Sequence, residues 1–381
     1  MRPVSAIPLL VPDMPAPEVL VPYLARIHAS RHYSNFGPLV CELEARLAER
    51  FQAPGGPSVS VTTVSNATLG LELALATVDR PRPLRVLLPA LTFVATATAV
   101  LRIGHVPVIA DVDPHTWLLT PDIAQETLRT TPFDVVMPVA SFGAPQDMRG
   151  WNRFEQAHGV PVIVDAAGAY GSQWLAGSTG TAVFSLHATK SLPAGEGGFV
   201  VSTDAALVHK VRQLSNFGIN LDPDSDMPVG CLASVGTNAK MSEFHAAVAL
   251  ASLEVWEERA ALRGKLHASQ RAELNAACGG LLRWQALAQP QAAPTMLCVR
   301  LPSAALRAEV EARCAAAGVG TRQWYQPLLG TMLAITERCV LLPTATADDI
   351  AADMLGLPFY PGMREELNQK IVGLMASVVN P

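Results

Sequence analysis

An alternation of short apolar segments with helix-like segments, from about residue 57 to residue 167, constrains the fold most strongly. The apolar segments are rich in β-branched residues and cover residues 58–64, 86–91, 106–112, 135–141 and 160–167. Apolar residues at helical spacing separate them, in segments 67–78, 92–104, 121–129 and 149–158. Strands that are apolar on both faces must be covered on both faces, so the pattern predicts an α/β fold with a large, mostly parallel central sheet between helices.

The rest of the chain predicts a second, smaller domain. Residues 182–186 and 198–203 have the composition of two further strands, and 241–266 has that of one long helix whose apolar stripe becomes charged. We expect a large domain over residues 1–255 and a smaller C-terminal α+β domain over residues 256–381. Half of the 381 residues are hydrophobic, which is enough apolar material for a large core.

Composition excludes several classes of function. The net charge of −5 gives no electrostatic reason to expect nucleic acid or an anionic membrane as a partner. No segment approaches the ~20 apolar residues of a membrane helix, and prolines and Asp13 interrupt the apolar N-terminus, which lacks the features of a signal peptide. The six cysteines have no CxxC spacing, so we expect reduced core residues in a soluble cytoplasmic protein with no metal site.

Polar residues fall where predicted strands end, which is where ligands collect in an open α/β sheet. Asp165 closes an apolar strand, either as the N-cap of a following helix or as a carboxylate that pairs with a cation in the cleft. Asn66, Ala67 and Thr68 lie where a strand turns into a helix, where free backbone N–H groups bind anions and where Ser65 could also cap the helix. Phe93 begins another helix and either belongs to the core or lies flat against a planar ligand.

Lys190 lies in the segment FSLHATKSLPAGEGG between two predicted strands. No P-loop pattern surrounds it, and Ser185, at the end of the preceding strand, could donate to a phosphate. A planar, phosphorylated ligand with an aldehyde for an amine and a ring nitrogen for an acid would use this whole set, and pyridoxal 5'-phosphate (PLP) is such a ligand. Lys190 would then form a Schiff base, and Asp165 would keep the ring nitrogen protonated.

Eight ordered blocks carry a resemblance over nearly the whole chain. They are YSNFGPLVCELEARLAERF (33–51), VSNATLGLELAL (64–75), PALTFVATATAV (89–100), VPVIVDAAGAYGS (160–172), FSLHATKSLPAGEGGFVVSTD (184–204), VGTNAKMSEFHAAVALASLE (235–254), GVGTRQWYQPL (318–328) and LGLPFYPGM (355–363). In this order they resemble the DegT/DnrJ/EryC1/StrS family, the PLP-dependent nucleotide-sugar aminotransferases.

The resemblance implies the fold-type-I aminotransferase architecture, PLP as cofactor, and a homodimer with shared active sites. It implies that Lys190 forms the Schiff base and moves the proton, and that Asp165 pairs with the ring nitrogen. The other implied roles are stacking on the ring by Phe93, phosphate binding by Ala67, Thr68 and Ser185, contact with the neighbouring subunit's phosphate by Asn238, and proximity to the sugar for His187 and Tyr325.

Three positions depart from the family pattern. Gly168 stands where the family has a glutamine that contacts the phenolic oxygen of the cofactor, Lys240 replaces an arginine, and Phe217 replaces a histidine. None of these changes removes a group that is essential for transamination.

The resemblance implies ping-pong amino transfer from an amino acid, glutamate, to a nucleotide-linked keto-deoxysugar. Three alternatives stay open. The first is a sugar dehydratase or eliminase of the same fold, against which the retained Lys190 argues, because the family's 3-dehydratase branch has histidine there. The second is amination of a cyclitol or an aminobenzoate precursor, and the third is a non-catalytic protein that binds PLP.

Overall fold

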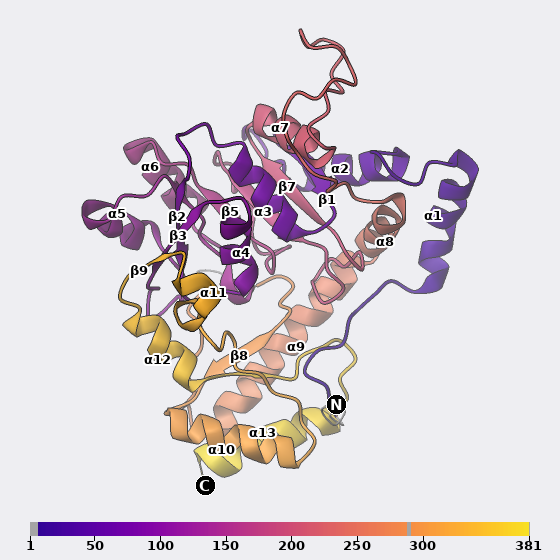
Figure 1. The fold of residues 1–381 in the computed structure, drawn as a ribbon. Helices are drawn as coiled ribbons and strands as arrows, with labels where there is room; N and C mark the ends of the chain where they lie inside the picture. Colours follow the sequence, from indigo (N-terminus) through magenta and orange to yellow (C-terminus); the bar gives the residue numbers. More distant parts are fainter. Residues whose placement is uncertain (1–6, 288–290, 381) are drawn as a thin grey trace.

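A central β-sheet with helices on both faces forms the body of the protein (Figure 1). The computed structural model describes residues 7–287 and 291–380. The strands are β1 (Ser60–Val64), β2 (Arg85–Pro89), β3 (Val106–Ala110), β4 (Val135–Val136), β5 (Ile163–Asp165), β6 (Thr181–Ser185), β7 (Gly198–Ser202), β8 (Leu297–Arg300), β9 (Val340–Leu341) and β10 (Met354–Leu357).

The helices largely follow the predicted segments. They are α1 (Pro17–Ser30), α2 (Pro38–Phe51), α3 (Ala67–Ala76), α4 (Val94–Arg102), α5 (Pro121–Thr130), α6 (Met148–His158), α7 (Ala205–Ser215), α8 (Glu243–Glu254), α9 (Trp256–Ala277), α10 (Ala304–Ala316), α11 (Leu333–Thr336), α12 (Ala345–Asp353) and α13 (Glu365–Val379), with 3-10 turns at Ser141–Gly143 and Leu329–Thr331. Among these helices, none combines the length and the apolar character that crossing a membrane requires.

The predicted mostly parallel sheet is confirmed. Two four-stranded sheets, in the orders β1-β7-β6-β5 and β4-β2-β3-β9, are joined by parallel bridges from Val136 to Val162 and from Val139 to Asp165. β7 runs antiparallel to both of its neighbours, and the other strand pairs described in this sheet are parallel. The carboxyl ends of β2, β5 and β6 therefore meet along one edge.

Successive residues of the central strands enter different cores, because side chains alternate across a sheet. Phe199 and Val201 of β7 pack with α2, α6 and α8, whereas Val200 packs with α3, α4 and α7. Both faces are therefore buried, as the uninterrupted apolar strands predict.

The C-terminal part has its own core. The antiparallel pair β8–β10 packs against α9, α10 and α13 (Figure 1). The sheet also receives a strand from this part of the chain, since β9 pairs with β3. The domain boundary at residue 255 falls between α8 and α9 and stays a prediction.

Two details of the sequence prediction were wrong. The long helix expected over residues 241–266 is two helices, because Ser242 caps α8 by accepting from the His245 N–H, and Val255, with φ −106° and ψ 5°, leaves the helical conformation before α9. The cysteines are all free, but Cys41 and Cys231 are exposed rather than part of the core.

Candidate active site

A cavity of about 480 Å³ opens at the carboxyl ends of β2, β5 and β6. Residues 295–296 and 322–325 line it from the C-terminal part of the chain. Of the residues predicted from the sequence, the cavity brings together Ala67, Thr68, Phe93, Asp165, Ser185, His187, Lys190 and Tyr325, together with Gly168. Asn238 does not line it.

Asp165 is the buried acid of this cavity, with 4% of its surface exposed. Its Oδ2 accepts from the Thr96 hydroxyl at 2.8 Å, and its Oδ1 accepts from the Ala167 N–H at 3.1 Å. The Thr96 hydroxyl proton points to the carboxylate, so the Thr96 oxygen is free to accept a hydrogen bond. The Thr92 hydroxyl donates to it, with the two oxygens 2.9 Å apart. No helix of the described chain starts directly after Asp165, since the next one is α7 at Ala205, so the N-cap alternative is wrong.

Burial shifts the pKa values of Asp165 and Lys190 in opposite directions. Burial raises the pKa of the Asp165 carboxyl, although its hydrogen bonds and Lys190 oppose the shift. Burial lowers the pKa of the Lys190 ammonium, and the Asp165 carboxylate partly offsets this. A carboxylate that burial destabilises gains from a cation placed against it, and a lysine with a lowered pKa offers the neutral amine that acts as a nucleophile.

The start of α3 forms an anion cradle. The Asn66 side chain caps this helix by accepting from the Leu69 N–H, so the expected Ser65 cap is wrong. The N–H groups of Ala67 and Thr68 have no hydrogen bond among the described residues. Ser185 accepts from the His187 N–H, so its hydroxyl proton is left to donate. Gly198 passes so close that a Cβ there would lie 2.7 Å from the Ala67 nitrogen. A phosphate fits these donors.

An aromatic group and a histidine complete the cavity. Phe93 is 50% exposed, so a face of its ring is open to a flat ligand. Tyr325 stacks on Phe142, with ring centres 5.2 Å apart. The Thr189 N–H donates to Nδ1 of His187, and Nε2 of the same ring lies 3.7 Å from Glu196.

Sequence reasoning missed several residues of the cavity. Thr92 lies two residues before α4 and Thr96 lies in its first turn, so helical spacing does not relate them and no sequence signal singles them out. Thr295, Arg322 and Trp324 also line the cavity. They come from the C-terminal part, and no local pattern indicates that they face Lys190.

Asn238 lies exposed on the segment between α7 and α8, and its Oδ1 accepts from Lys240 at 2.8 Å. The Lys240 ammonium in turn lies 4.5 Å from the centre of the Phe217 ring. Two of the three departures from the family pattern thus contact each other. Among residues 7–287 and 291–380, no cluster of three or more metal-ligating side chains was found.

Comparison with known proteins identifies the family. The profile of the DegT/DnrJ/EryC1/StrS aminotransferase family matches residues 18–376. The chain belongs to this family. As in other DegT/DnrJ/EryC1/StrS aminotransferases, PLP is the expected cofactor, and the cavity fits it: Lys190 for the aldehyde, Asp165 for the ring nitrogen, and the α3 cradle for the phosphate.

Curated proteins are related to this chain in sequence. Protein Rv3402c of Mycobacterium tuberculosis (strain ATCC 25618 / H37Rv) is 32% identical over 278 residues, which cover 69% of this chain and 64% of that protein. The chain thus spans about 64% of the length of the curated relatives that it matches.

Solved structures share the fold. A provisionally assigned PLP-dependent aminotransferase from Bacillus cereus ATCC 10987 is 25% identical with a TM-score of 0.86, over 97% of this chain and 99% of that one. DesI, solved in the presence of its TDP-sugar product, is 30% identical with a TM-score of 0.83, over 99% of this chain and 94% of that one. The predicted fold-type-I architecture is confirmed.

Proposed function

We propose that this protein is a PLP-dependent aminotransferase that moves an amino group from glutamate to a nucleotide-linked keto-deoxysugar. The observation that carries the proposal is that Lys190 and the buried Asp165 line one cavity together with the anion cradle of α3. A nucleotide-sugar substrate is supported by the likeness to DesI, which was solved with a TDP-sugar product.

PLP, when bound, supplies an aldehyde for the amino group and a ring that accepts electrons. Lys190 Nζ, whose pKa burial lowers, takes the α-proton of the amino donor in the first half-reaction. In the second half-reaction it delivers a proton to the carbonyl carbon of the keto sugar. Asp165 would hold the positive charge of a protonated ring nitrogen. Thr96 and the Ala167 N–H fix the orientation of its carboxylate for this role.

The remaining predicted residues would bind and orient ligands. The N–H groups of Ala67 and Thr68 and the hydroxyl of Ser185 would hold the phosphate, and Phe93 would cover one face of the ring. His187 and Tyr325 lie on the same cavity and are proposed to contact the sugar.

A homodimer with shared sites is also proposed. The segment between α7 and α8 extends away from the body of the molecule (Figure 1). It exposes apolar side chains, namely those of Leu221, Val229, Leu232 and Val235. Apolar side chains gathered on a projecting segment are typical of a protein interface. Asn238, which lies outside the cavity of its own chain, would reach the phosphate of the partner subunit.

The central experiment incubates the purified protein with PLP, glutamate and a panel of nucleotide keto sugars, with products read by mass spectrometry. We expect one sugar to gain an amino group while glutamate becomes 2-oxoglutarate. Glutamate alone should bleach the absorbance of the bound cofactor. If the absorbance persists with every amino acid tried, aminotransfer is refuted and elimination or binding alone is favoured.

Asn238→Ala tests the shared site. We expect weaker PLP binding, measured by titration of the cofactor-free protein, and a dimer in analytical ultracentrifugation. A fully active monomer would refute the shared site.

The six free cysteines suit the reducing cytoplasm in which we propose that the enzyme works.

A further inference from the structure

The chain before α1 runs along the C-terminal part of the molecule before it reaches α1 (Figure 1). Residues 7–13 are called here the N-terminal strap. The Ile7 carbonyl accepts from the Gly320 N–H at 2.8 Å, and the Leu9 carbonyl accepts from the Phe359 N–H at 3.0 Å. One end of the strap is therefore attached to the C-terminal part by backbone hydrogen bonds.

Asp13 attaches the other end of the strap to α9. Its carboxylate pairs with Arg259, and its second oxygen lies 3.5 Å from the Arg263 guanidinium. Arg263 is only 4% exposed, and among the residues that the structure describes Asp13 is the one acid paired with it. Because a buried guanidinium that loses its counter-charge is strongly destabilised, this pair holds Asp13 on α9.

Leu10 lies between the two attachments, and its side chain lines the cavity that contains Lys190. The attachments at Leu9 and Asp13 fix the backbone on both sides of it, so its position is set before a ligand binds. A leucine side chain has no hydrogen-bonding group. At this wall of the cavity it therefore offers a ligand apolar contact alone.

We propose that Leu10 contacts the deoxygenated carbon of the sugar substrate, and that Asp13 is a positioning residue for this contact. A hydroxyl group pressed against leucine would lose its hydrogen bonds to water, whereas a carbon that has lost its hydroxyl has none to lose. Glutamate fits this wall less well, because both of its ends are charged. The inference rests on the proposed function and adds to it a reason for the choice of a deoxysugar.

Calorimetry on the PLP-loaded protein tests the contact without turnover. The probes are thymidine diphosphate glucose and its 6-deoxy analogue, neither of which has a ketone to aminate. We expect the wild type to bind the 6-deoxy analogue ~10-fold more tightly than the glucose compound, and Leu10→Ala to remove most of this preference. Leu281→Ala, which changes an exposed leucine outside the cavity, is the matched control and should keep it.

Asp13→Asn tests the positioning role. We expect the preference for the 6-deoxy analogue to fall about 3–10-fold, and Asp13→Glu to recover part of it. Hydrogen exchange should become faster at the Gly320 and Phe359 N–H groups, which the strap binds, and stay unchanged in the central sheet. Glu126→Gln, which removes the acid of an exposed ion pair, is the control and should change neither measurement.

Several results would overturn the inference. An unchanged preference in Leu10→Ala would overturn the contact, and an equal loss for both probes would overturn its assignment to the deoxygenated carbon. If Leu10→Ala raised only the glutamate concentration needed to bleach the cofactor, the contact would belong to the amino donor. Faster exchange throughout Asp13→Asn would overturn the positioning role in favour of a general effect on folding.

Failure of the proposed function gives a different result. A wild type that prefers the 6-deoxy analogue through Leu10 but transfers no amino group would refute aminotransfer alone.

Discussion

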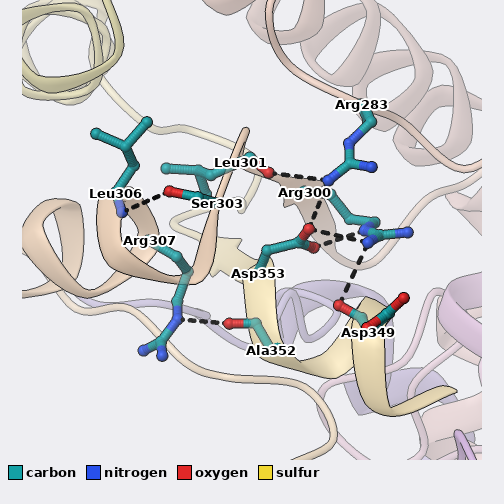
Figure 2. Close-up of polar contacts among 9 residues, drawn as sticks. All are labelled: Arg283, Arg300, Leu301, Ser303, Leu306, Arg307, Asp349, Ala352 and Asp353. Atoms are coloured by element: carbon teal, nitrogen blue, oxygen red, sulfur yellow. Dashed lines mark hydrogen bonds and ion pairs between the residues drawn. The ribbon is translucent and has the colours of Figure 1, made fainter. Parts of the chain in front are cut away.

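Asp165 and Asp353 are both buried carboxylates, with 4% and 6% of their surfaces exposed, yet their surroundings differ. Asp353 accepts two hydrogen bonds from Arg300, at 2.5 and 2.9 Å, and one from Arg283 at 2.5 Å (Figure 2). Asp165 accepts from one hydroxyl and one backbone N–H, and it pairs with no arginine among the described residues.

The difference separates a structural charge from a functional one. Two guanidinium groups, those of Arg283 and Arg300, surround the single carboxylate of Asp353, so this carboxylate is fully paired and ties β8 to the end of α12. Asp165 has neutral hydrogen-bond donors and the half-buried Lys190 in its surroundings, and its own burial raises the pKa of its carboxyl. A buried acid that faces a cavity and whose pKa is raised by burial is placed to pair with a cationic group of a bound ligand.

The largest effect should follow replacement of Lys190, which lines the same cavity as Asp165. We expect Lys190→Ala to lower the single-turnover rate with glutamate by roughly 10⁴-fold, because both the nucleophile and the proton carrier are lost. Borohydride should fix the cofactor onto the peptide that contains Lys190 in the wild type and on no peptide in the variant. Lys370→Ala, a surface lysine that binds the Ala317 carbonyl, is the control and should keep full activity.

Asp165→Asn should separate activity from stability. We expect the single-turnover rate to fall about 10²–10³-fold, since a charge that stabilises the reacting centre is lost. The fold should survive, because the amide removes a buried charge. The raised pKa means that the cofactor-free wild type loses stability as pH rises through the pKa of Asp165, and Asp165→Asn should lose this dependence. Urea unfolding at several pH values measures it.

Asp353→Asn should give the opposite result. It leaves Arg300 buried without a full counter-charge, so we expect the free energy of unfolding to fall by about 3 kcal/mol. The single-turnover rate per folded molecule should match that of the wild type, because Asp353 does not line the cavity. A variant that is stable but inactive would contradict the assignment of this cluster to structure.

The smallest effect should come from the hydroxyl that orients Asp165. We expect Thr96→Val to lower the rate about tenfold, as for one lost hydrogen bond to a charged group. That hydrogen bond lowers the pKa of Asp165, so its removal should raise the pKa and move the acid limb of the pH–rate profile to higher pH. An acid limb that stays in place would separate Thr96 from the ionisation of Asp165.

Much of this protein could be predicted from its sequence. Strands such as Gly198–Ser202 are apolar at successive positions, so the covered sheet follows from local chemistry. Asp165, Ser185 and Lys190 fall after or at strand ends, so their meeting at one edge follows from parallel topology. The break at Val255 could not be predicted, because residues 253–260 contain no glycine or proline that would mark it.

The sequence by itself therefore determined the covered sheet and the edge at which the lysine, the acid and the anion cradle meet. Only the tertiary structure decided which charged side chains form ion pairs. Arg300 and Arg322 are both arginines of the C-terminal part, but one lies against Asp353 and the other against Trp324 at the cavity. The physical reason is that local pattern fixes hydrophobic burial, whereas pairing of charges depends on contacts between residues far apart in the chain.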